Sequence, residues 1–183
     1  EDALGEEARY KNAKLAYYTG EFEWAEGQLS VLKTATSELI ANDALKLSML
    51  IIENKTNDSV NIAMQAYAKA DLFLFQNKPK EALQLIDSIC TLNPSHPLQD
   101  DFLFLKASVL QSINDFDGVI LALEKIKKEY ANDVLADDAL NELATIYVYL
   151  KKDATAKVCY EELIEKYPGS TFVNNARLFL NKK

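Results

Sequence analysis

The stretch "ATIYVYLKKDATAKVCYEELIEKYP", residues 144–168, indicates how this chain folds. Its apolar residues recur every three or four positions in two runs, and the polar break "LKKDA" at 150–154 separates the runs. Apolar residues at this spacing line one face of a helix. We therefore expect two helices joined by a short turn, that is, a helical hairpin.

The same pattern recurs along the chain with a period of 37 residues. The first helix of each hairpin carries a small residue at Ala70, Ala107 and Ala144, and a large one three positions later. So many positions in one register indicate repeated architecture rather than a single active site. Further positions in this register are Phe73, Leu110 and Tyr147; Ala82, Val119 and Ala156; Ile86, Leu123 and Tyr160; and Ile89, Ile126 and Leu163.

A short motif with two adjacent acidic or amide residues recurs along the chain. "LADDAL" (135–140) is matched by "LQDDFL" (98–103), "IANDAL" (40–45), "FVNNAR" (172–177) and "LGEEAR" (4–9). Asp and Asn at a helix start accept hydrogen bonds from its unpaired N–H groups and suit the positive end of its dipole. We expect every copy to begin a helix. Adjacent carboxylates such as Asp137 and Asp138 point about 100° apart on a helix, which suits neither proton sharing nor metal binding.

The composition indicates an all-α protein. Apolar residues make up 49% of the 183 residues, with only 5 Gly and 4 Pro, which disfavours strand-and-turn folds. The net charge of −8 excludes a nucleic acid partner, because phosphates would be repelled. The longest apolar runs, such as "MLII" (49–52), are too short to span a membrane.

Candidate catalytic and metal-binding residues are few. His96 is the only histidine and lies in a turn, where we expect a solvated side chain, and we expect Cys90 and Cys159 to be small buried residues. Glycine-based nucleophile and phosphate motifs are missing from the sequence. We expect no metal, no cofactor and no enzyme activity; an enzyme using Asp100 and Asp101 is the least favoured alternative.

Two stretches share small, large and turn residues at fixed spacing. Residues 144–168 supply Ala144, Tyr147, Ala156, Tyr160, Leu163 and Pro168, and "GEFEWAEGQLSVL" (20–32) supplies Gly20, Phe22, Ala25, Leu29 and Leu32. This arrangement resembles the tetratricopeptide repeat family. It departs from the family in its longer period and in three turns, where Asn77, Asn114 and Lys151 replace Gly. The long period and "YPGS" (167–170) are similar to bacterial envelope members of the family.

The resemblance implies a right-handed superhelix of stacked antiparallel hairpins with about ten helices. We expect one repeat domain over residues 1–183. Only 21 residues separate Asp43 from Met64, the position 37 residues before Asp101, so one helix and the loop "ENKTNDS" (53–59) fit there but not a hairpin. The predicted parts are repeat units at about 4–38, 60–96, 98–131 and 134–168, an inserted, unpaired helix at 41–54 and a C-terminal capping helix at 171–181.

The first helices of the hairpins would line a concave surface that binds a peptide or a partner protein. By resemblance to peptide-binding members, positions off the packing face form this surface. They lack the clamp of Lys and Asn residues that holds a terminal carboxylate, so an apolar or β-branched peptide, or an adjoining helix of the parent protein, fits better. The alternative is that the aromatic residues pack against the inserted helix. The predicted partner-binding residues are Tyr10, Lys14, Tyr17, Tyr67, Asp71, Phe104, Ser108, Asn141, Thr145 and Val148.

The predicted function is a non-catalytic protein-interaction scaffold, and the alternative is a structural spacer or self-association module of a larger envelope protein. The sequence starts without Met, and we expect it to be the C-terminal part of a longer bacterial protein. From the resemblance we expect it in the periplasm or cell envelope.

Overall fold

The structure, a computed structural model, describes residues 3–35, 37–54, 61–92 and 96–181. Within these ranges it contains ten α-helices and no strands. The chain divides into two compact units, Glu1–Leu98 and Gln99–Lys183. The all-α prediction is confirmed. Most of the loop expected at 53–59 lies outside the described residues.

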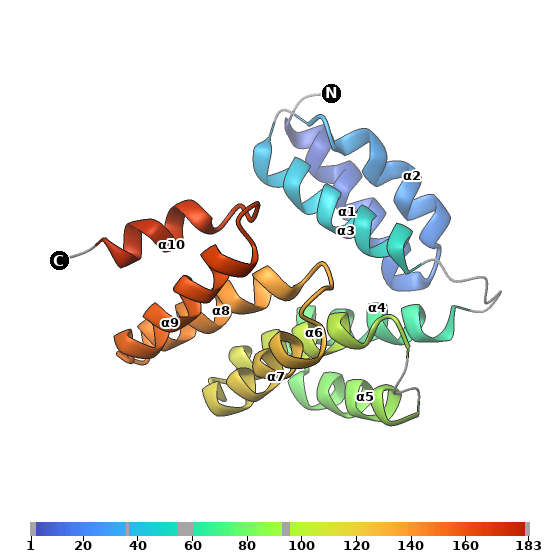
Figure 1. Ribbon diagram of the computed structural model, residues 1–183. Helices are drawn as coiled ribbons and strands as arrows, with labels where there is room; N and C mark the ends of the chain where they lie inside the picture. The colour runs from blue at the N-terminus through green and yellow to red at the C-terminus, as the bar shows by residue number, and fades with distance from the viewer. Residues whose placement is uncertain (1–2, 36, 55–60, 93–95, 182–183) are drawn as a thin grey trace. The chain divides into compact units, whose positions relative to one another are not determined.

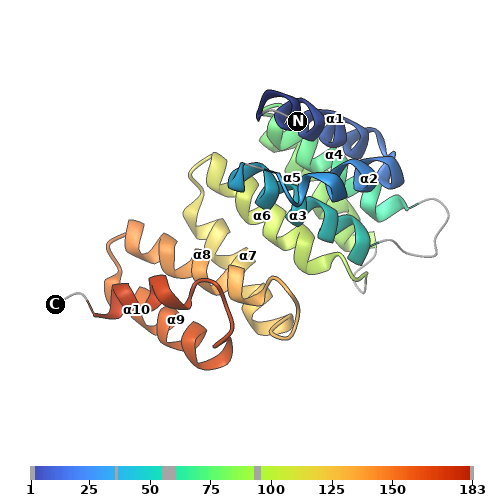
Figure 2. The ribbon, with the colours of Figure 1, turned by 90° about the horizontal axis from the view of Figure 1, so that it is seen from above.

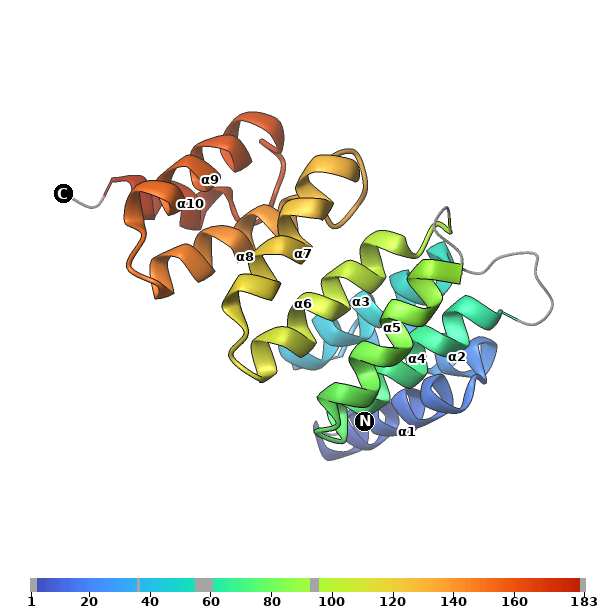
Figure 3. The ribbon, with the colours of Figure 1, turned by 90° about the horizontal axis from the view of Figure 1, so that it is seen from below.

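The first unit is organised around its first helix. Helices α1 (Ala3–Thr19), α2 (Phe22–Leu32) and α3 (Glu38–Glu53) lie side by side (Figure 1). Helices α4 (Ile62–Phe75) and α5 (Pro79–Leu92) form a hairpin (Figure 3), and α4 packs against α1. As a result α1 contacts α2, α3 and α4, and Ala13 and Tyr17 on it are completely buried.

The second unit packs each helix against the next along the chain. Its helices are α6 (Gln99–Ser112), α7 (Phe116–Glu129), α8 (Ala136–Tyr149), α9 (Asp153–Lys166) and α10 (Val173–Leu180) (Figure 2). Leu140 and Leu143 of α8 and Leu163 of α9 are buried between these helices. The Tyr167 hydroxyl donates to the Ala131 carbonyl at 2.6 Å, tying the end of α9 to the α7–α8 turn.

Helix α3 covers the segment for which an inserted helix was expected at 41–54. It begins at Glu38, where the Ser37 side chain accepts a hydrogen bond from the Ile40 N–H at 3.4 Å. The prediction that "IANDAL" (40–45) begins a helix is therefore wrong, because Ser37 caps the helix one turn earlier. The helix packs against α2 and α1.

The acidic phrases of the second unit do lie at helix starts. Asp100 and Asp101 are in the first turn of α6, and Asp137 and Asp138 are in the first turn of α8. Leu135 occupies the N-cap of α8 and makes no side-chain cap. The two carboxylates of α8 lie inside its first turn, where their charge suits the positive end of the helix dipole.

Each hairpin turn has the same backbone geometry, although the sequence differs. Gly20, Asn77, Asn114 and Lys151 all have a positive φ, between 58° and 86°. In each turn this residue donates its N–H to the carbonyl three positions back, and the next residue donates to the carbonyl five positions back, as Lys152 does to Tyr147 at 2.8 Å. This is the Schellman motif, which ends a helix with one left-handed residue. Asn tolerates that conformation, whereas Lys is strained in it.

We predict that Lys151→Gly stabilises the protein by about 0.5 to 1 kcal/mol. Glycine removes the left-handed strain of about 1 to 2 kcal/mol, and its greater freedom in the unfolded chain offsets part of the gain. Urea denaturation followed by circular dichroism measures the change. The control is Lys152→Gly at the neighbouring position, where φ is −98° and glycine relieves no strain. An equal loss of stability in both variants would contradict the strain at Lys151.

Candidate protein-interaction surface

Three of the predicted partner-binding residues meet in the first unit. Burial, and then the charges of Asp43 and Asp71, raise the pKa of Tyr10 to about 12. Asp43 lies on α3 and Asp71 on α4, so Tyr10 of α1 faces carboxylates from two neighbouring helices. Burial also raises the pKa of Asp71, against the lowering effects of Lys14 and of the Tyr18 hydroxyl.

Two aromatic rings lie beside the Lys14 ammonium group. The Lys14 Nζ lies 5.6 Å from the centre of the Tyr18 ring and 5.9 Å from that of Phe75, within the range of cation–π attraction. The two rings are 6.2 Å apart, centre to centre. We call Tyr10, Lys14, Tyr18, Asp71 and Phe75 the α1–α4 cluster. Phe75 is strongly exposed and the other four are half-buried, so the cluster is accessible to a partner.

The structure excludes Tyr17 from this surface. Its side chain is completely buried, and its ring lies 5.3 Å from Tyr18 and 6.0 Å from Phe22. The prediction for Tyr17 is therefore wrong, because this ring belongs to the core of the first unit. Tyr18 was not among the predicted residues, although Tyr10, Lys14 and Tyr18 recur every four residues on one helix face. Tyr67 is half-buried on α4.

The predicted residues of the second unit lie on the surfaces of α6 and α8. Phe104, Ser108, Asn141 and Val148 are half-buried and Thr145 is exposed. The Ser108 and Thr145 hydroxyls donate to the carbonyls of Phe104 and Asn141, at 3.2 and 2.9 Å. These two hydroxyls are thus hydrogen-bonded within their own helices. The predicted residues of α6 and α8 therefore offer a partner chiefly apolar and amide surface.

The sequence of the second unit also agrees with a known repeat. Residues 138–170, which run from the first turn of α8 to just past the end of α9, match the family model described as the tetratricopeptide repeat. A search of curated proteins finds no match. The match supports the resemblance of this part of the chain to the tetratricopeptide repeat family. Together with the ten helices of the described residues, eight of which form four hairpins, it confirms the predicted all-α, tetratricopeptide-repeat-like fold.

Tetratricopeptide repeats generally mediate protein–protein interactions. No helix in the described ranges is both long enough and apolar enough to cross a membrane. No three His, Cys, Asp or Glu side chains in those ranges gather as metal ligands would. His96 uses its Nδ1 to accept a hydrogen bond from the Leu98 N–H at 3.1 Å, within the turn before α6.

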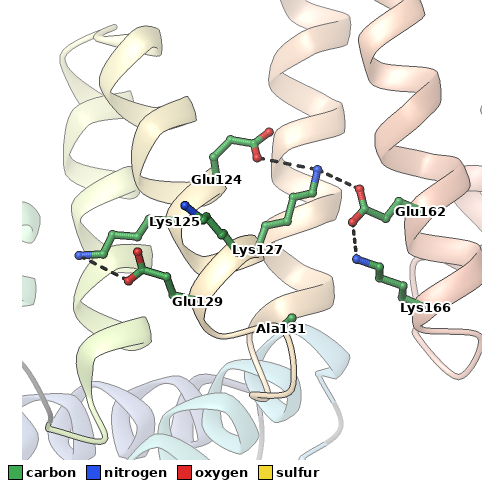
Figure 4. A pocket seen from close by; sticks show the side chains of 8 residues that line it. Glu124, Lys125, Lys127, Glu129, Ala131, Glu162 and Lys166 are labelled. Atoms are coloured by element: carbon green, nitrogen blue, oxygen red, sulfur yellow. Dashed lines mark hydrogen bonds and ion pairs between the residues drawn. The ribbon is translucent and has the colours of Figure 1, made fainter.

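The second helices of the last two hairpins are joined by ion pairs. The Lys127 ammonium of α7 lies 2.8 Å from the Glu162 carboxylate of α9 and 3.8 Å from that of Glu124 (Figure 4). Glu162 also pairs with Lys166, at 2.7 Å. Burial opposes the charge of Lys127, but the bond to Glu162 and the two carboxylates hold its pKa above the ordinary value. These side chains line an open hollow that holds four lysines and three glutamates, so its charges nearly balance. Their ion pairs with one another indicate a stacking contact rather than a binding site.

We predict that Glu162→Gln destabilises the protein at neutral pH by about 1 kcal/mol, since it breaks a half-buried bridge between α7 and α9. Despite burial, the bonds to Lys127 and Lys166 lower the pKa of Glu162, so its contribution is present above about pH 4.5 and is lost as pH falls through the lowered pKa. The variant should therefore be less sensitive to acid. Thermal unfolding at several pH values measures both effects.

The matched control is Glu161→Gln, because Glu161 is an exposed neighbour that pairs only within α9, with Lys157 at 3.7 Å. We expect little change in this control. If both variants respond alike, the bridge between the helices does not stabilise the stack.

Proposed function

We propose that the chain is a non-catalytic scaffold that binds a peptide or a partner protein on the first helices of its hairpins. The observation that carries this proposal is the α1–α4 cluster, where a cation, a carboxylate and three aromatic rings meet and Phe75 remains open to solvent. Tyr67, Phe104, Ser108, Asn141, Thr145 and Val148 would extend the binding surfaces of the two units.

The chemistry of the cluster favours a partner with apolar side chains. The rings of Tyr18 and Phe75 supply flat apolar surface, and Lys14 is already engaged by them. Asp71 brings a carboxylate to this cluster, so a second carboxylate from a ligand would add like-charge repulsion beside it. An apolar peptide segment that packs on Phe75 suits this environment better than an acidic chain end.

Self-association is the alternative function. Leu4 and Leu15 on α1 are exposed by 73% and 61%, and large exposed apolar side chains of this kind can form an interface between copies. Residence in the periplasm or cell envelope of a bacterium is part of the proposal. It is supported by the likeness of the 37-residue period and "YPGS" (167–170) to envelope members of the family.

We predict that Lys14→Ala combined with Phe75→Ala weakens binding of the partner at least fivefold, because the pair removes the exposed ring and the ammonium group beside it. A partner is first isolated by affinity capture on the wild-type chain and is then titrated by calorimetry against both proteins. Both positions are partly exposed, so the variant should keep the helical circular dichroism spectrum.

The control is Leu121→Ala, which changes a strongly exposed apolar residue of α7. Equal affinities of the control and the double variant would contradict the proposed surface. A concentration-dependent dimer in sedimentation, with no other protein captured, would favour the self-association module.

A further inference from the structure

Helix α3 has an apolar face that its neighbours leave uncovered. The phrases "IANDAL" (40–45) and "LADDAL" (135–140) align α3 with α8 at a separation of 95 residues. Ala44, Ser48 and Ile51 are buried, and their counterparts in α8, Ala139, Leu143 and Ile146, are buried too. This shared face packs against the preceding helix, α2 in one case and α7 in the other. Helix α3 therefore occupies the place of the first helix of a repeat.

Helices α3 and α8 differ in the burial of a second face, which lies beside the shared one. In α8, Leu140 and Ala144 are buried, at 1% and 0% exposure, where α9 packs against them. Their counterparts in α3, Leu45 and Met49, are exposed by 42% and 39%. One turn further, Ile52 is 53% exposed where α8 has the half-buried Tyr147.

The cause is the path of the chain after α3. Helix α4 packs against α1, whereas in the hairpins α4–α5, α6–α7 and α8–α9 the second helix covers the first. The matching residues of α4 and α6, which include Ala70 and Ala107, are accordingly buried. Helix α3 is thus the first helix of a repeat whose second helix is not supplied by the helix that follows it.

The surroundings of this face indicate the chemistry of its occupant. At the C-terminal end of α3 a hollow of about 420 Å³ lies between α2, α3 and the start of α4, lined by Phe22, Ile52 and Met64. Glu23 and Glu26 of α2 also line it. Exposed Glu38 and Glu53 lie at the two ends of α3, against the single Lys46 in its middle. An apolar strip with acidic borders suits an amphipathic helix with basic flanks.

We propose that the face formed by Leu45, Met49 and Ile52 is a docking site for a basic amphipathic helix of a partner protein, which lies on α3 as α9 lies on α8. The model for this occupant is α9, a 14-residue helix whose Ala156, Tyr160 and Leu163 are buried. The occupant would have a small residue followed by large apolar ones four and seven positions later, with Lys or Arg beside them.

The probe for the test is a fluorescein-labelled peptide with the sequence of residues 153–166. It carries Cys159→Ala and Lys in place of Glu161, Glu162 and Glu165, and a scrambled peptide of the same composition is the control probe. Fluorescence anisotropy measures binding to the whole chain. We expect saturable binding of the designed peptide and at least tenfold weaker binding of the scrambled one.

Variants of α3 locate the binding site. Met49→Lys and Leu45→Lys should each weaken binding at least tenfold, because they place a charge on the docking face. Leu39→Lys adds the same charge to the same helix at a strongly exposed position outside that face, and it should change affinity less than twofold. All three replace exposed side chains, and thermal unfolding verifies that they fold.

The double variant Lys14→Ala and Phe75→Ala should keep the affinity for the peptide, which separates this site from the α1–α4 cluster. The inference is overturned if the designed peptide does not bind, or if Leu39→Lys weakens binding as much as Met49→Lys. It is also overturned if sedimentation shows a dimer of the chain and Met49→Lys makes that dimer dissociate, since a second copy would then be the occupant.

Discussion

The structure depends on one constraint: a helical hairpin cannot bury its own apolar face. Two helices joined by a short turn cover one stripe of each other and leave the remaining apolar residues to the next element. In the second unit each helix supplies that cover for the one before it, from α6 to α10. Small residues such as Ala144 and Ala156 allow the two helices of a hairpin to approach closely, and both are completely buried.

The turns make the hairpins alike even where the sequence is not. A left-handed residue, followed by a bond to the carbonyl five positions back, sets the direction in which the second helix leaves the first. Gly20 fits this conformation without strain, and Asn77 and Asn114 tolerate it. Since Lys151 also adopts it, the packing of α8 against α9 outweighs the backbone strain at this position.

The sequence predicts the hairpins well because their signals are local. Helical spacing within 144–168 and the 37-residue register identify α8 and α9 from neighbouring residues alone. The binding surface is harder to predict, because Tyr17 and Tyr18 differ by a rotation of about 100° on α1. The packing of α2 and α4 around α1 decides which of the two is buried. The start of α3 is a related case: the acidic phrase at 40–45 predicts a helix start, whereas Ser37 supplies a cap one turn earlier.

Hydrogen exchange of a chain with Leu163→Val tests the central claim most directly. Leu163 is completely buried in α9, so the substitution weakens one stacking layer without removing it. If hairpins are covered only by their neighbours, amide exchange should become faster in α8 and α9, less so in α7 and α10, and remain unchanged in α1 to α5. Equal acceleration in all ten helices would instead show one cooperative core and contradict the account.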